Sequence, residues 1–257
     1  MRVPQVDLAR VGVLEVPAWL RGSLLEAYLT DLAPRLSGQV AIMDEAQALA
    51  AKQRLLASPF VAKVGLQRVF PDRFRAELSL REPRMEVYRL RDADVPSAEP
   101  IAYLDRDAVL MPPLGRLGLP RVLSAAKPGP ESMGKQAEDD RLRAAVAVAI
   151  EWQEQVLPLC PVKTPPLVEV DASNLGYRML GDQVFSEVQI GLARVGGKTA
   201  WLAYTHPPGS KWPRVAKEVL AGVMTAILEK HRGLEFVEHA DLRFQKRWMD
   251  RVRLAPE

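Results

Sequence analysis

An alternating pattern of apolar and polar residues defines one strand in the first part of the chain. Apolar side chains fall on every second position from Phe74 to Leu80, with charged or polar residues between them. This period of two predicts a strand with one buried face. A second strand is predicted from Val64 to Phe70, and Pro71-Asp72 favours a turn between them because proline presets φ. We expect a hairpin that ends at Pro83, since proline cannot donate to a strand ladder.

Helical periodicity precedes this hairpin in two places. Apolar residues recur on one side of the segment from Arg21 to Ala33, which predicts a helix. Asp44, with Gln47 three residues later, is a capping-box arrangement that predicts a second helix reaching Ala57. A short strand is predicted from Val11 to Val16. The expected order is strand, helix, helix, strand, strand, with both helices on one face of a three-stranded sheet.

After the hairpin, the pattern predicts short strands interrupted by two amphipathic helices. Residues 136–157 and 213–230 carry apolar residues at spacings of three and four, which predicts both helices. A strand pair is predicted around Asp105, and the further predicted strands are Leu167–Asp171, Gly176–Leu180, Val184–Ile190, Ala200–Tyr204 and the tail Phe236–Leu254. The expected fold class is α+β, a β-α-α-β-β module followed by a larger mixed β-sheet domain with two amphipathic helices.

Composition narrows the class of protein. Of the 257 residues 48% are apolar, which is ample for a packed core. The 35 basic and 32 acidic residues leave a net charge of +3, too small an excess to predict a nucleic-acid surface. The single Cys160 forms no internal disulfide and is expected to be a buried structural residue. No run approaches the roughly 20 apolar residues of a membrane span, and the N-terminus lacks a signal peptide's apolar centre.

Few features invite a catalytic or ligand-binding interpretation. The run from Gly191 to Thr199, GLARVGGKT, has five residues between its first glycine and the Gly-Lys pair, whereas a phosphate-binding loop has four. A turn with an exposed Lys198 is predicted instead. His206, His231 and His239 do not have metal-ligand spacing, and no Ser or Cys has a neighbouring His to activate it. The sequence therefore gives no positive evidence for an enzyme, a cofactor or a metal site.

Six short motifs occur one after another along the chain. They are Pro59-Phe60-Val61, the strand and turn at residues 64–71, Arg81-Glu82-Pro83, residues 104–109, Leu119-Pro120 and Asp241-Leu242-Arg243-Phe244. In this order they resemble the periplasmic part of the bacterial cell-division family FtsQ, called DivIB in some bacteria. The family has "V-x-x-V-x-V-x-R-x-x-P" at the first strand, "I-D-x-x-G-x-V" later and "D-L-R-Y" near its end. The resemblance covers Val11 to Leu254. Two departures are Asp107, near the position of the family's glycine, and the lack of a preceding membrane-spanning helix.

The resemblance implies a domain organisation and a function. It places a POTRA domain at residues 11–82 and an FtsQ-type β-domain at residues 83–257. It implies a non-catalytic scaffold of the division complex, or divisome, that binds other division proteins through sheet edges. The implied partners are membrane proteins resembling FtsB and FtsL, with FtsK or FtsW as further candidates, and no nucleic acid, cofactor or small-molecule substrate.

The resemblance also implies a location. This chain would be the periplasmic part of a single-pass inner-membrane protein at the division septum, with an anchor helix not present here. An alternative is a POTRA-bearing component of outer-membrane protein assembly or secretion. Such a protein would continue into alternating barrel strands of about ten residues, whereas this sequence predicts two amphipathic helices among short strands.

Two partner-binding sites follow from the resemblance. The first is a C-terminal edge strand from Asp241 to Val252 that captures a partner strand, with site residues Arg243, Phe244, Lys246, Arg247, Trp248 and Arg251. Together with Arg253, its charges would suit an acidic partner, and its aromatic rings would serve as anchors. The alternative is that these charges only protect an exposed edge from aggregation.

The second site is a recruitment site on the strand before the proline turn. Its residues are Lys63, Leu66 and Arg68. The alternating pattern places Leu66 on the apolar face of that strand, which favours a structural role for this residue.

Overall fold

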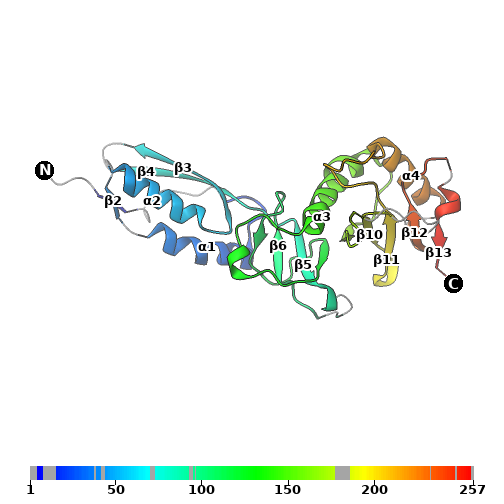
Figure 1. Ribbon diagram of the computed structural model, residues 1–257, viewed down its shortest axis with the longest axis horizontal. Coiled ribbons are helices and arrows are strands. Elements are labelled where there is room, and N and C mark those ends of the chain that lie inside the picture. Colours follow the sequence, from blue (N-terminus) through cyan, green and yellow to red (C-terminus); the bar gives the residue numbers. More distant parts are fainter. Residues whose placement is uncertain are drawn as a thin grey trace.

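A computed structural model describes the greater part of the chain. The described residues are 5–7, 16–37, 39–41, 44–69, 73–92, 95, 97–176, 186–231, 233–246 and 248–255. Within them the protein is a mixed α+β fold with four α-helices and a nine-stranded mixed sheet, which confirms the predicted class. The molecule is elongated, with the N-terminal helices at one end of its longest axis and the C-terminal strands at the other (Figure 1).

The N-terminal part consists of two helices packed beside a hairpin (Figure 1). Its main elements are α1 (Gly22–Leu36), α2 (Glu45–Leu56), β3 (Val61–Val69) and β4 (Arg73–Leu80). The strands pair antiparallel, with Val64 opposite Leu78 and Leu66 opposite Ala76. Ala76, Leu78 and Leu80 are half-buried, whereas Glu77 and Ser79 between them are exposed. The predicted hairpin and its alternation are therefore confirmed; its Pro71-Asp72 turn lies outside the described residues.

Other local predictions for this part have mixed outcomes. The side chain of Asp44 accepts a hydrogen bond from the backbone N–H of Gln47 at 3.0 Å, which confirms the cap of α2. The strand expected at Val11 to Val16 lies outside the described residues except for Val16, which is not in a strand. Two short strands that were not expected, β1 (Gln5–Asp7) and β2 (Gln39–Ala41), pair antiparallel with each other. Among the described residues the sheet of the hairpin therefore has two strands, β3 and β4, whereas three were expected.

The large sheet runs along the rest of the molecule. Its strands are β5 (Met85–Arg89), β6 (Ala102–Leu104), β7 (Leu110–Met111), β8 (Arg121–Ser124), β9 (Leu167–Asp171), β10 (Gln189–Ala193), β11 (Thr199–Ala203), β12 (Val237–Asp241) and β13 (Arg253–Leu254). Their spatial order is β13-β12-β11-β10-β9-β8-β5-β6-β7. The predicted strand at residues 176–180 lies outside the described residues apart from Gly176. The predicted strand Val184–Ile190 falls partly outside them too, and β10 begins at Gln189.

Two helices supply the crossovers that parallel strands require. Helix α3 (Asp140–Glu151) connects the parallel pair β8 and β9, and α4 (Lys217–Lys230) connects β11 and β12. Both begin four residues later than predicted, and α3 continues as a π-helical turn, Trp152–Val156. Gly233, with φ of 86°, donates its N–H to the carbonyl of Leu228 and caps α4 as expected. No helix in the described part of the chain is long and apolar enough to cross a membrane.

The two faces of the large sheet differ in chemistry. One face contributes buried aliphatic residues to the core that also includes α3 and α4: Val87, Val122, Val170, Ile190, Leu202 and Ala240. On the other face, one row of directly opposed residues crosses six strands: Glu86, Arg121, Glu169, Gly191, Trp201 and His239. This second row is mostly polar, so the core lies on the helix-covered side.

The β7 edge of the large sheet is covered by the N-terminal part. A buried cluster joins the two, and its members are Leu20, Leu24, Tyr28, Phe60, Tyr103 and Met111. The rings of Tyr28 and Phe60 stack with centroids 4.2 Å apart. This contact places α1 and the start of β3 against β6 and β7, so the hairpin and the large sheet share one apolar contact.

A buried ion pair lies next to this cluster. The guanidinium of Arg81 is 2.6 Å from the carboxylate of Asp105, and the Asp105 side chain is 4% exposed. The same carboxylate accepts the backbone N–H groups of Asp107 and Val109. Tyr28 donates its hydroxyl hydrogen to the carbonyl of Arg81. We call these four contacts the joint, because they tie β4 and α1 to the turn between β6 and β7.

That turn contains the one non-glycine residue with positive φ among the described residues, Ala108 at 56°. The left-handed region costs an alanine about 1–2 kcal/mol, which explains a preference for glycine at this turn.

Candidate partner-binding surfaces

The C-terminal residues do not form the long edge strand that the sequence predicts. Strand β12 ends at Asp241, a turn region follows, and residues 249–251 form a 3₁₀ helix. The edge of the sheet is β13, which has two residues and pairs antiparallel with β12. The expected strand from Asp241 to Val252 is therefore wrong, and the site residues lie on the connection between two strands.

Asp241 and Arg243 shape the start of this connection. The buried carboxylate of Asp241 accepts the backbone N–H of Arg243 at 3.0 Å. It also accepts Nε and Nη2 of the same arginine at 2.8 and 2.7 Å, a two-pronged ion pair. Arg243 was expected to bind an acidic partner directly. That role stays a prediction, and the geometry adds that Arg243 fixes the turn, because breaking this pair would leave a buried charge uncompensated.

Phe244 follows directly, and two guanidinium groups lie close to its ring. Arg243 lies 5.6 Å and Arg251 lies 4.8 Å from the centre of its ring. Such cation–π contacts are favourable by about 0.5–1 kcal/mol at exposed sites. Phe244 is 38% exposed, so the ring is held in place while part of it remains accessible.

Trp248 forms a second aromatic element of the connection. It is partly buried against the main core, and His231 of the α4 end meets it edge-on at 6.5 Å. Lys230 lies 5.5 Å from the centre of its ring and also contacts the sulfur of Met249, which is 57% exposed. Trp248 is thus anchored, whereas Met249 adds exposed apolar surface beside it.

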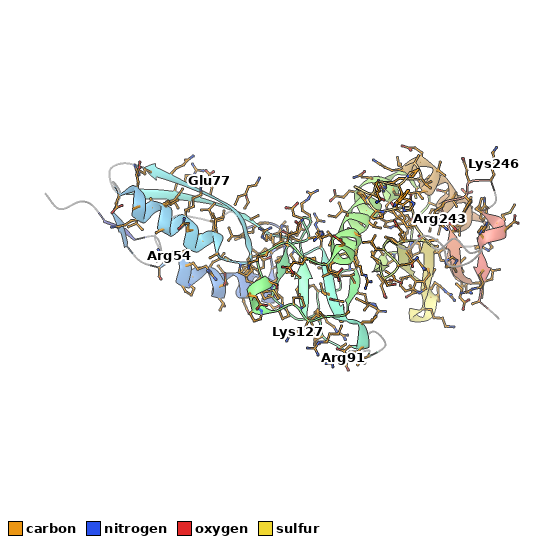
Figure 2. The ribbon with its side chains drawn as sticks, viewed as in Figure 1. Arg54, Glu77, Arg91, Lys127, Arg243 and Lys246 are labelled. Carbon is orange, nitrogen blue, oxygen red and sulfur yellow. The ribbon has the colours of Figure 1, made fainter. Side chains whose placement is uncertain are left out.

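The remaining charged site residues are Lys246, Arg247 and Arg251. Lys246 and Arg251 are exposed, and Lys246 projects from the same end of the molecule as Arg243 (Figure 2). Arg247 lies outside the described residues. We call the described set the basic–aromatic cluster: Arg243, Phe244, Lys246, Trp248 and Arg251.

Two histidines near this cluster stay uncharged at neutral pH. Burial, reinforced by the neighbouring Lys230, lowers the pKa of His231 below its ordinary value. Burial also lowers the pKa of His239, on the polar face of β12. The positive charge of the surface therefore comes from lysine and arginine, and it does not depend on pH near neutrality.

One side of the β13 backbone has no neighbouring strand in the part of the chain that the structure describes. The N–H of Ala255 bonds to the carbonyl of Phe236 at 2.8 Å, so residues 253 and 255 face β12. Because successive residues of a strand point their backbone groups to opposite sides, Leu254 turns its N–H and C=O away from the sheet. Both β13 side chains are exposed, and Arg253 pairs with Glu238 at 3.0 Å. The edge is short but accessible.

The three predicted recruitment residues do not share one face of β3. Lys63 is exposed, whereas Leu66 is half-buried and packs with the cluster between the hairpin and the helices. Arg68 is half-buried too, with its guanidinium 3.9 Å from Glu45 at the start of α2. Leu66 thus has a structural environment, and Lys63 is the member that a partner can reach.

Sequence reasoning missed several buried ion pairs. Besides Arg81 and Asp105, Glu151 pairs with Arg214, and Glu187 lies 2.5 Å from His206. Each pair joins residues far apart in the chain, so no local spacing signals it. Among the described residues no group of three or more His, Cys, Asp or Glu could hold a metal ion.

The glycine-rich run from Gly191 to Thr199 and the single cysteine both have structural surroundings. The run GLARVGGKT spans β10, a turn with Gly196 and Gly197 at positive φ, and the start of β11, with Lys198 exposed as predicted. Cys160 is partly buried near the carbonyls of Val156 and Ala221. Burial raises the pKa of its thiol, which keeps it protonated and poorly nucleophilic.

Comparison with known proteins adds no family assignment. No model of a known protein family matches the sequence, and no curated protein sequence matches it.

Proposed function

We propose that this protein is the extracytoplasmic part of a non-catalytic divisome scaffold of the FtsQ/DivIB type. In this proposal it captures a strand of a partner protein at the free edge of β13. The observation that carries the proposal is the accessible backbone of Leu254 beside the basic–aromatic cluster. An open edge offers unpaired backbone groups for β-augmentation, and exposed anchors next to it supply specificity.

The arrangement of the N-terminal part supports the assignment of a POTRA domain to residues 11–82. Two helices pack beside a two-stranded hairpin whose outward face is polar. The large sheet with α3 and α4 then corresponds to the β-domain at residues 83–257. The interruption of short strands by two helices favours this assignment over the outer-membrane alternative. In the proposal an anchor helix outside this chain holds the protein at the inner membrane of the septum.

The partner is expected to present an extended segment with acidic residues and an apolar side chain. Lys246 and Arg251 supply exposed positive charge, and Phe244 supplies the partly accessible ring. Arg243 acts indirectly, because its ion pair with Asp241 positions Phe244. Small division proteins resembling FtsB and FtsL are the proposed partners.

The test measures binding of the cognate FtsB-like and FtsL-like pair to the wild-type protein and to Phe244→Ala with Trp248→Ala. Removing anchors of this kind costs about 2 kcal/mol, roughly a thirtyfold loss of affinity. Circular dichroism and a melting curve verify that the double variant folds. Leu49→Ala, at an exposed leucine of α2, is the matched control and should bind normally. Unchanged affinity of the double variant would remove this surface from the proposal.

The recruitment role is narrowed to Lys63. Charge reversal at this exposed residue should reduce localisation to the division site, whereas the same change at exposed Lys211 should not. Normal localisation of Lys63→Glu would show that β3 does not recruit the protein through this charge.

A further inference from the structure

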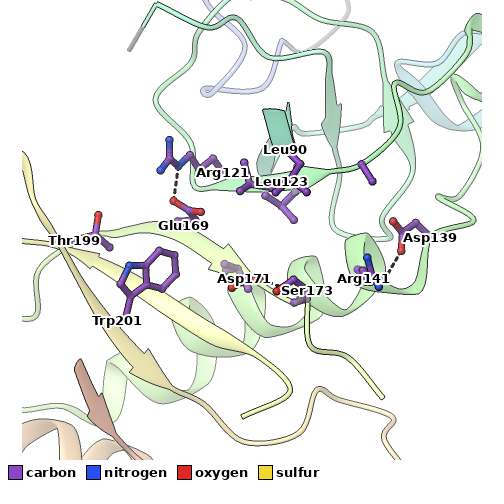
Figure 3. A pocket seen from close by; sticks show the side chains of 14 residues that line it. Leu90, Arg121, Leu123, Asp139, Arg141, Glu169, Asp171, Ser173, Thr199 and Trp201 are labelled. Atoms are coloured by element: carbon purple, nitrogen blue, oxygen red, sulfur yellow. Dashed lines mark hydrogen bonds and ion pairs between the residues drawn. The ribbon is translucent and has the colours of Figure 1, made fainter. Parts of the chain in front are cut away.

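The strands from β7 to β8 and those from β9 to β13 form two halves of the large sheet, which are joined by one ladder position. Strands β8 and β9 pair at one register position, Arg121 with Glu169. By contrast, β5 and β8 pair from Glu86 with Arg121 through to Arg89 with Ser124. Beyond their one rung β8 and β9 separate, and a groove of about 390 Å³ lies between them. Figure 3 shows this groove at the carboxyl ends of both strands, beside the start of α3.

The walls of the groove carry backbone groups that face each other. The N–H of Glu86 bonds to the carbonyl of Pro120 at 2.9 Å, so residues 120 and 122 of this segment face β5. By alternation, Arg121 and Leu123 face β9. Arg121 makes the single rung, whereas the next rung, from Leu123 to residues 170 and 172 of the opposite strand, is absent among the described residues. An inserted strand could bond to both walls.

The groove opens on the polar face of the sheet. Trp201 lies across Gly191, where an added Cβ would be 3.3 Å from the indole ring and 3.3 Å from Cβ of Glu169. The missing side chain of Gly191 therefore lets the indole reach toward the groove, which Leu123 lines from the other wall. Apolar side walls of this kind would hold the stem of a long side chain.

The charges in the groove favour a basic occupant. Arg121 and Glu169 pair with each other at 2.5 Å. Asp171 and Asp139 each accept one backbone N–H, from Ser173 and Arg141, and neither has a cationic partner among the described residues. The side chain of Arg141 is the one cation lining the groove beyond that pair. Two carboxylates against one guanidinium leave an excess of negative charge.

From this geometry we propose that the groove between β8 and β9 receives an extended segment of a partner protein as an inserted strand. The segment carries a lysine or arginine that pairs with Asp171, while its stem packs on Leu123. Strand insertion into a sheet is an established mode of peptide recognition, in which main-chain hydrogen bonds give affinity and alternate side chains give specificity. This site is separate from the β13 edge, so either can fail without the other.

The test uses the 257-residue protein and the pentapeptide acetyl-Thr-Val-Lys-Val-Thr-amide, followed by NMR at the backbone amides. In the free protein the amide of Leu123 should exchange with solvent much faster than that of Val122, which faces β5. The peptide should protect the amides of Leu123 and Ala172. The same peptide with Glu in place of Lys should bind at least about fivefold more weakly, as expected for reversing a cross-strand charge pair.

A conservative variant isolates the charge. Asp171→Asn keeps an oxygen to accept the Ser173 N–H and should weaken binding of the lysine peptide about fivefold. Asp44→Asn, a chemically matched change at the cap of α2, should leave binding unchanged. Equal binding of both peptides, no binding, or slow exchange of the Leu123 amide in the free protein would overturn the proposal. Protection that rises with protein concentration alone would identify a second copy as the occupant and would overturn it as well.

Discussion

The two edges of the large sheet are built in opposite ways. At β7, Leu110 and Met111 are buried, and the outer backbone of Leu110 is used twice. Its N–H bonds to the carbonyl of Lys135 at 2.9 Å, and its carbonyl accepts the N–H of Gly134 at 2.7 Å. At β13 both residues are exposed, and the backbone of Leu254 faces away from the sheet.

The difference lies in what the chain places over each edge. The β7 edge has a neighbouring segment, an apolar cluster and the joint, so it belongs to the interior of the molecule. Around the β13 edge the described residues present exposed charged, aromatic and aliphatic side chains, and the charges deter aggregation without closing the edge. The residues that lie over a sheet edge thus decide whether it is an internal contact or stays open to another chain. Substitutions at the β7 edge and at the β13 edge test this difference.

The largest effect is expected from Asp105→Ala at the closed edge. The change leaves Arg81 buried without its partner and removes the acceptor for two backbone N–H groups. Breaking a buried pair in this way should lower the free energy of unfolding by about 3–5 kcal/mol, measured by urea denaturation. Arg253→Ala at the open edge removes an exposed ion pair and should cost at most about 1 kcal/mol. Similar losses for the two variants would contradict the distinction.

A pair of proline variants compares the edges at the backbone. Leu110→Pro removes the N–H that bonds to Lys135 and should destabilise the protein by about 1–3 kcal/mol or more. Leu254→Pro removes an N–H that faces away from the sheet and should change stability by less than about 0.5 kcal/mol. It should nevertheless abolish strand capture. If Leu254→Pro bound the partner normally, the partner would not add to β13 through its backbone.

A smaller gain is expected from Ala108→Gly. Relief of the left-handed backbone at this residue, offset in part by the loss of its buried methyl group, should raise the free energy of unfolding by less than about 1 kcal/mol. Ala125→Gly, at an exposed alanine without positive φ, serves as the control and should give no gain. A loss of stability at Ala108→Gly would show that the turn does not strain this residue.

The smallest expected effect is a pH dependence near the open edge. The pKa values of His231 and His239 in the folded protein lie below their ordinary 6.5, chiefly because burial disfavours the charged ring. The unfolded chain therefore binds more protons than the folded one as pH falls through 6.5, and stability should decline there. His239→Gln should flatten the decline in thermal unfolding measured between neutral and mildly acidic pH. An unchanged slope would assign it to other groups.

Local patterns in the sequence were sufficient for the elements whose determinants are local. The hairpin follows from the period of two around Leu78, and the start of α2 follows from Asp44 and Gln47. The C-terminal connection was predicted wrongly because no glycine or proline marks its turn. Instead Asp241 and Arg243 close the turn by a side-chain ion pair, and cation–π contacts hold Phe244. Side-chain contacts of this kind leave no periodic pattern of apolar residues in the sequence.

The joint and the groove could not be predicted for a related reason. Arg81 and Asp105 belong to different elements, and nothing in their sequence neighbourhoods indicates that they meet. The groove depends on the angle at which β8 leaves β9 after Arg121, and an angle between strands has no signature in residue spacing. Both features arise from packing of elements that were themselves mostly predicted.

The single rung between β8 and β9 has a mechanical consequence. The strands of the large sheet succeed one another along the longest axis of the molecule, from β6 and β5 to β11, β12 and β13 (Figure 1). A tension applied between the two ends would therefore act perpendicular to the strands, along the hydrogen bonds that join them. The weakest place under such a load is the Arg121–Glu169 rung, where α3 and its core contacts carry the force that backbone hydrogen bonds carry elsewhere. Stretching the molecule would load this single rung, whereas the neighbouring β5–β8 pair would share the load over four register positions.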